Sequence, residues 1–216
     1  MVRPREAMNS VVADPRPAGA ILVLCGLNLA LTLLTAPRLH AFALRTFEEA
    51  GRAAPVADIG PAKTFFGATA VVSAAASSVV LPLLWWLVLA GLLFGFGALI
   101  GRRVPFGHLY TVAAYAYPPV IVAHLLQSIF VLANPVEKMN SITTSLAAFL
   151  PAGMQGPLYN FLLQVDPFGL WSLGLAALGG ALVLETDLKK TATFLFGLWL
   201  GYASLVAFVL LPLVPR

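Results

Sequence analysis

"VDPFGLWSLGLAALGG", residues Val165–Gly180, begins with an acidic residue and a proline and then becomes almost purely apolar. An aspartate side chain accepts hydrogen bonds from the free N–H groups of a helix N-terminus, and its charge suits the positive end of the helix dipole. Proline is favoured at the first helical position, where its missing N–H costs nothing. We therefore predict that Asp166 and Pro167 begin an apolar helix, and that Asp166 is a helix cap with no part in chemistry.

The composition of the whole chain points to a membrane protein. Its 216 residues are 60% hydrophobic and 10% charged, with a mean hydropathy of +0.90, whereas soluble domains are about half apolar and about a quarter charged. The net charge of +4 comes from basic residues that stand singly or in pairs, so we expect no nucleic-acid partner. The single cysteine, Cys25, lies in an apolar run, which predicts a core residue without a disulfide or metal.

The long apolar segments predict an all-α, polytopic membrane protein. A membrane-spanning helix needs about 20 mostly apolar residues to cross about 30 Å of hydrocarbon. Residues 1–17 are polar and proline-rich and are expected to form a short disordered cytosolic tail, and residues 18–214 are expected to form one five-helix transmembrane domain. The five predicted spans are Ala18–Ala36, Val79–Ile100, Leu109–Ala133, Phe168–Leu184 and Thr191–Leu211.

Three segments are expected to depart from straight spans. The small, Ser-rich stretch Ala68–Ser78 predicts an extended or kinked approach to the second span. The charged, amphipathic stretch Pro37–Thr64 predicts a short helix that lies on the membrane surface. Between Asn134 and Val165, prolines and glycines break an apolar sequence, so that Ser141–Gln164 is expected either at the interface or in a shallow re-entrant hairpin.

The basic residues of the short loops predict the orientation. Arg102–Arg103 and Lys189–Lys190 lie in tight loops, and five spans place both pairs on the same side as the N-terminus. Short loops weigh most in the positive-inside rule. The N-terminus is therefore expected in the cytosol and the C-terminus on the extracytoplasmic side.

Pairs of small residues, four positions apart, mark candidate helix contacts. Such a pair makes a flat face on which another backbone can approach closely, either within this chain or from a partner or second copy. The second span has two successive pairs, the fifth span has one, and the fourth has a further small pair. These pairs are Gly91/Gly95, Gly97/Gly101, Gly197/Gly201 and Ala176/Gly180.

Polar side chains inside the third span form a second candidate feature. At helical spacing, Tyr117, His124, Gln127 and Ser128 fall on one face, and Pro118 and Pro119 are expected to kink the start of this span. This polar stripe either makes interhelical hydrogen bonds or lines a path for protons or small molecules. Asn28 on the first span is interpreted as structural.

No sequence motif indicates an enzyme. The chain lacks a nucleophile elbow, a zinc-protease motif, a phosphate-binding glycine loop and paired carboxylates on one face. We therefore expect no catalytic residues, no cofactor and no metal.

Two stretches resemble the Yip membrane family of Ypt/Rab-interacting proteins. They are "GRRVPFGHLYTVAAYAYPPVIVAHLL", Gly101–Leu126, and "VDPFGLWSLGLAALGGALVLETDLKKTATFLFGLWL", Val165–Leu200. The resemblance implies a five-span fold, a cytosolic N-terminus and no established catalytic residues. Eukaryotic members are linked to Rab GTPases and carry a long N-terminal region with a "DLYGP"-type motif. This chain is more similar to the short prokaryotic members, sometimes associated with export systems, so a Rab-type partner is not expected.

These observations lead to two functional hypotheses. The first is a non-catalytic adaptor or organiser of membrane complexes or membrane transport, which contacts other membrane proteins or itself through its helices. The alternative is a small transporter, channel or lipid-perturbing protein that uses the polar stripe on the third span.

Overall fold

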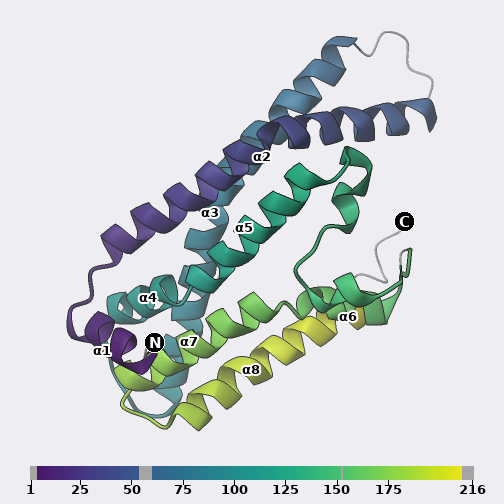
Figure 1. Ribbon diagram of the computed structural model, residues 1–216. Coiled ribbons are helices and arrows are strands. Elements are labelled where there is room, and N and C mark those ends of the chain that lie inside the picture. Colours follow the sequence, from purple (N-terminus) through teal and green to yellow (C-terminus); the bar gives the residue numbers. More distant parts are fainter. Residues whose placement is uncertain (1–3, 54–59, 152, 211–216) are drawn as a thin grey trace.

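Every regular element in the described part of the chain is helical, which confirms the all-α class. The computed structural model describes residues 4–53, 60–151 and 153–210. Its helices are α1 (Pro4–Ala13), α2 (Pro17–Ala53), α3 (Gly60–Leu99), α4 (Phe106–Tyr115), α5 (Pro118–Ala133), α6 (Pro157–Gln164), α7 (Pro167–Val183) and α8 (Leu188–Leu205), with the short turns η1 (Val136–Ser141), η2 (Leu146–Phe149) and η3 (Val206–Leu210) (Figure 1).

Four helical segments are long and apolar enough to cross a membrane: Pro17–Ala50, Lys63–Leu99, Phe106–Ala133 and Leu188–Leu210. A fifth candidate arises if α6 and α7, bent by 50° at the break between them, are one span. Alone, α7 has 17 residues, which is about 26 Å of helix and short of the hydrocarbon thickness. The protein is therefore an integral multi-pass membrane protein with four spans, or five with the bent pair. Leu211, the last residue of the fifth predicted span, lies outside the described residues.

The first two long helices differ from the prediction. α2 has 37 residues and α3 has 40, so each is about 55–60 Å long and exceeds the hydrocarbon thickness. α2 continues through Pro37, and α3 is helical across Ala68–Ser78. The predicted surface helix and the predicted extended approach were therefore both wrong. The two helices lie side by side instead (Figure 1).

Close contacts between α2 and α3 explain this difference. A side chain on Gly67 would lie only 2.6 Å from the His40 ring, so the missing side chain lets the two helices approach. The rings of Phe47 and Phe66 are 5.2 Å apart. The amphipathic part of α2 thus covers its apolar face with α3, where the sequence pattern had suggested a membrane surface.

The serines of α3 are compatible with helix because they bond within it. Ser73 Oγ donates to the carbonyl of Ala70 at 3.0 Å, and Ser78 Oγ donates to Ala75 at 2.7 Å. The surrounding alanines have the highest helix propensity of all residues. The Ser-rich stretch therefore continues the helix.

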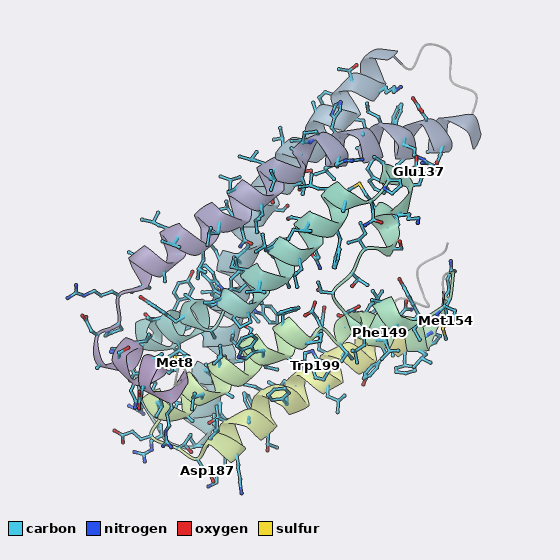
Figure 2. The ribbon with its side chains drawn as sticks, viewed as in Figure 1. Met8, Glu137, Phe149, Met154, Asp187 and Trp199 are labelled. Carbon is cyan, nitrogen blue, oxygen red and sulfur yellow. The ribbon has the colours of Figure 1, made fainter. Side chains whose placement is uncertain are left out.

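The N-terminal tail contains a packed helix, and the expectation of disorder was wrong. α1 packs against α4 and α7, and its Met8 is only 4% exposed (Figure 2). The Met8 Sδ atom lies 2.9 Å from the place where a side chain on Gly179 would begin. Gly179 thus leaves the space that Met8 fills. Pro4 at the first helical position and Glu6 in the first turn are both typical of a helix start.

The third predicted span is broken at its two prolines, as expected. α4 ends at Tyr115 and α5 begins at Pro118, with Pro119 following. Proline has no N–H for the preceding turn and its ring clashes with the carbonyl four residues back. The break separates a short helix from the part of the span that carries the polar stripe.

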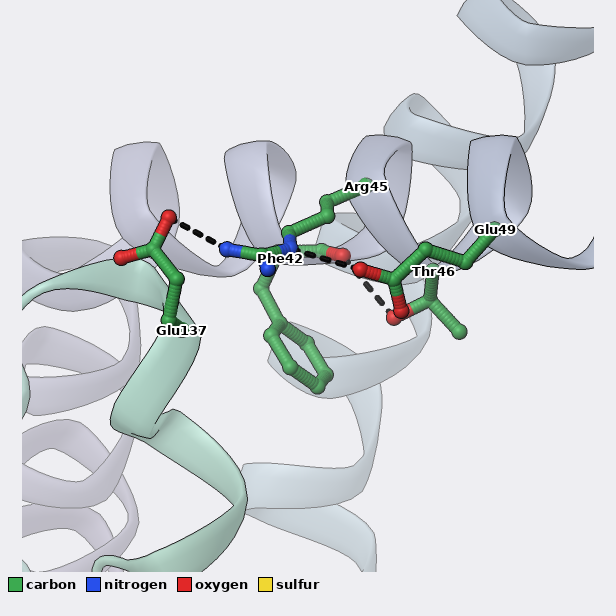
Figure 3. A network of polar contacts seen from close by, with 5 residues as sticks. All are labelled: Phe42, Arg45, Thr46, Glu49 and Glu137. Carbon is green, nitrogen blue, oxygen red and sulfur yellow. Dashed lines mark hydrogen bonds and ion pairs between the residues drawn. The ribbon is translucent and has the colours of Figure 1, made fainter.

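The segment between α5 and α7 is made of short helices held against the rest of the chain. Leu146 N donates to the Val165 carbonyl at 2.9 Å, which brings the two ends of the segment together. Near its start, Glu137 of η1 pairs with Arg45 of α2, which also pairs with Glu49 at 2.8 Å (Figure 3). The position of this segment relative to the bilayer, at the interface or re-entrant, stays a prediction.

The short basic loops gather at one end of the bundle. α1, the α3–α4 turn and the α7–α8 turn lie there, whereas the last turns of α8 lie at the other end (Figure 1). Arg102 of the first turn donates to the backbone oxygen of Glu185 in the second at 3.3 Å. The arrangement therefore groups the loops that the sequence placed on the N-terminal side.

Candidate functional site

The polar stripe of the third span lines a cavity of about 850 Å³. Tyr117, His124, Gln127 and Ser128 all contribute to its wall. The other walls come from α2, α3 and the first turns of α7. α3 packs mainly against α2 and α4, whereas α5 packs against α2 and α7, and the cavity occupies the space between these two groups.

Asn28 of α2 joins two members of the stripe. Its side chain is only 3% exposed. Its Oδ1 atom lies 2.7 Å from His124 Nδ1, and its Nδ2 donates to the Tyr117 hydroxyl at 3.4 Å. Because an amide oxygen only accepts hydrogen bonds, His124 carries a proton on Nδ1. One side chain of the first span thereby holds two side chains at the start and middle of α5.

Gln127 connects the stripe to the cap of α7 through a residue that sequence analysis missed. Gln127 Nε2 donates to Thr144 Oγ1 at 3.1 Å, and Thr144 Oγ1 in turn donates to Asp166 Oδ2. Thr144 lies in the irregular segment between α5 and α7, 17 and 22 residues from its two partners. No local pattern marks it, because the chain brings these residues together only by folding. Ser128, in contrast, donates to the His124 carbonyl of its own helix at 2.8 Å.

Asp166 stands at the N-terminus of α7, and Pro167 is the first residue of this helix. The Asp166 Oδ1 atom accepts hydrogen bonds from the backbone N–H groups of Phe168, at 2.8 Å, and Gly169, at 3.2 Å. One carboxylate oxygen therefore serves the helix end, while the other accepts from Thr144. The bond to Thr144 is a second role for the Asp166 carboxylate.

The second span's glycines fall into three different environments. Gly97 is buried, and a side chain there would begin 2.7 Å from the Leu184 side chain. Gly101 instead ends α3 with a φ of +72°, and the Arg102 N–H donates to the Gly97 carbonyl at 2.8 Å. This is the hydrogen-bond pattern of a glycine-terminated helix. The expected contact face at Gly101 is therefore corrected to a helix end.

The remaining glycines of the predicted pairs are exposed. No heavy atom of the described chain lies within 4 Å of a side chain added at these four positions, Gly91, Gly95, Gly197 and Gly201. These faces of α3 and α8 are consequently open on the outside of the bundle.

The closest glycine contacts occur in α7. A side chain on Gly180 would begin 2.6 Å from Leu93, and one on Gly179 would begin 2.6 Å from Val112. Sequence analysis singled out Gly180 with Ala176, which is fully buried, but missed Gly179 because its four-residue neighbour is not small. The signal that was available is the dense run of small residues in "LAALGG".

The chemical groups of the cavity suit binding by hydrogen bonds. Its lining contains hydroxyl, amide and imidazole groups among apolar side chains, and no Asp, Glu, Lys or Arg is found among the described residues that line it. Within the described ranges, no three His, Cys, Asp or Glu side chains come together in a way that could hold a metal ion.

The family model of the Yip1 domain matches residues 1–211 of the chain. No curated protein and no solved structure matches it. The family match extends over all the candidate spans, and it includes both stretches that carried the resemblance. This chain is a member of the Yip1 domain family.

Proposed function

We propose that this Yip1 domain protein is a non-catalytic organiser of membrane complexes, which holds other membrane proteins or a second copy through helix contacts. The observation that carries the proposal is the pair of open glycine faces, Gly91/Gly95 on α3 and Gly197/Gly201 on α8, to which no other described residue comes close. Helices in lipid associate through close van der Waals packing, for which small residues at this spacing are well suited. An outward-facing pair is therefore available to a helix of another chain.

A pair of variants tests this proposal. Leucines at Gly91 and Gly95 should leave a folded protein that loses its cross-linked partners, because the added side chains hold a neighbouring helix away. Ala76→Leu is the matched control, since Ala76 is also exposed on α3. The measurement is cross-linking in native membranes followed by purification and identification of bound proteins. Unchanged partners in the double variant would contradict the proposal.

The orientation is part of the same proposal, with the N-terminus in the cytosol. It is supported by the short loops with Arg102–Arg103 and Lys189–Lys190, which lie at the same end of the bundle as α1. Reporter fusions at the two termini test it. We expect a cytosolic signal from the N-terminus and an extracytoplasmic one from the C-terminus, whereas signals on one side at both ends would contradict the five-span topology.

The cavity favours a second candidate function, the binding or passage of a small molecule along the polar stripe. Its volume of about 850 Å³ falls within the range of ligand sites, and four polar residues of one helix line it. Proteoliposome flux measurements separate passage through the protein from simple binding.

A further inference from the structure

The cavity contains hydrogen-bonding groups that the described chain leaves partly unused. The Ser172 side chain lines it, is 4% exposed and makes no hydrogen bond within the described residues. The Tyr117 hydroxyl accepts from Asn28 but donates to no described residue. His124 bonds through Nδ1, which leaves Nε2 free for a ligand. In a membrane interior, unpaired polar groups are costly, so these atoms favour a ligand that hydrogen-bonds to them.

The same cavity has an apolar side that faces outward. Leu81, Leu84, Trp85 and Val88 of α3 line it, and their side chains are between 47% and 60% exposed on the surface of the bundle. This part of α3 belongs to a candidate membrane span. The cavity therefore extends from the buried hydroxyl groups to a surface that lipid chains would cover.

The charges of the lining restrict the head group of a ligand. Among the described lining residues there is no Lys or Arg, and a phosphate buried without a cationic partner would be strongly unfavourable. The nearby Asp166 carboxylate, which accepts from Thr144, adds to the bias against an anionic group. A phospholipid head group therefore fits poorly, whereas a hydroxyl or carbonyl head fits the available donors and acceptors.

We propose that this cavity binds a neutral amphiphile from the bilayer, with a hydroxyl or carbonyl head group at Tyr117, His124 and Ser172 and an apolar tail against α3. The inference deepens the second candidate function and does not depend on the glycine faces. Two sources share this chemistry, a diacylglycerol and an isoprenoid quinone.

The test uses the full-length protein in nanodiscs, with dioleoylglycerol and a short-chain ubiquinone as separate probes and phosphatidylcholine as the charged comparison. Native mass spectrometry measures how many molecules stay bound. One molecule of at least one neutral probe per protein is expected, and the two arms show which source it is. Binding of neither probe, or equal retention of phosphatidylcholine, overturns the inference.

Two kinds of variant locate the site. Ala74→Phe fills the lined space, and Ala76→Phe is its control on the same helix outside the cavity. Ser172→Ala combined with Tyr117→Phe removes two hydroxyl groups, and Ser73→Ala is its control. We expect both cavity variants to weaken binding at least about tenfold while helicity and monodispersity are kept.

Unchanged binding in the folded double variant overturns the assignment of the head group, whatever the fate of Ala74→Phe. Loss of partners in the leucine variants of Gly91 and Gly95 is a separate result. Failure of the lipid inference is therefore distinguishable from failure of the helix-contact proposal.

Discussion

Two halves of the bundle are packed in different ways. Where α1, α4, α7 and α8 meet the C-terminal part of α3, side chains such as Leu93, Leu109 and Leu195 are almost completely buried. Where α2, α3 and α5 face one another, a cavity of about 850 Å³ remains. The packed half has glycines directly under long side chains, as at Gly180 and Leu93. The open half has polar groups in the corresponding place.

The polar groups of the two halves also differ in their partners. In the packed half, Thr111 donates to the Gly107 carbonyl of its own helix at 2.8 Å, so it needs nothing from its neighbours. In the open half, Asn28, Tyr117 and His124 bond across helices. Bonds within a helix let the helices close on apolar surface, whereas bonds between helices hold them at the distance that the polar side chains require.

The largest expected effect is in the packed half. Gly180→Leu should destabilise the fold by about 1–3 kcal/mol, because the new side chain has to displace Leu93. Gly174→Leu on the same helix is the control, since no described heavy atom lies within 4 Å of a side chain there. Thermal unfolding in detergent measures both. Equal stability of the two variants would remove the basis of the comparison.

The next largest effect is expected at the link across the open half. Asn28→Ala removes the partner of both His124 and Tyr117 and should cost about 1–2 kcal/mol. Asn134→Ala is the matched control, because the Asn134 side chain is exposed at the end of α5 and bonds only to the Phe130 carbonyl. If both variants unfold at the wild-type temperature, the interhelical bonds do not hold the open half together.

A smaller effect is expected at the cap of α7. Asp166→Ala should cost about 0.5–2 kcal/mol, whereas Asp166→Asn should be mild, since asparagine also caps well. The same unfolding measurement applies, with Asp187, which caps α8 through the Lys189 N–H at 2.9 Å, as the comparison position for an alanine substitution. If Asn abolishes partner or ligand binding in a well-folded protein, a charged role replaces the capping role.

The smallest effects are expected in the two turns at the packed end. Gly101→Ala should cost about 1 kcal/mol, because Gly101 has a φ of +72°. Glu185 occupies the same left-handed region with a φ of 48°, so Glu185→Gly relieves that strain but loses an exposed pair with Arg102. Its net change should be within about 1 kcal/mol of zero. Unfolding scans of both variants test the sign of the difference.

Much of the architecture follows from local sequence. The apolar runs, the break at Pro118 and the helix start at Asp166 all depend on hydrogen bonds and solvation within a few residues, which a sequence pattern contains. The open glycine faces on α3 and α8 belong here only in part. Four-residue spacing shows that a face is flat, but not whether it meets this chain, as Gly97 does, or none of its described residues, as with Gly91.

The partners of each surface were decided by tertiary structure. The amphipathic part of α2 needed an apolar surface, and its sequence could not distinguish α3 from lipid, because both bury the same face. The helix α1 depends on the space at Gly179, far away in sequence. The bonds from Gln127 to Thr144 and from Thr144 to Asp166 likewise join segments that only the fold brings together. Sequence by itself determined which segments are helical and apolar, and the three-dimensional packing decided what each face contacts, since contact energies depend on neighbours distant in the chain.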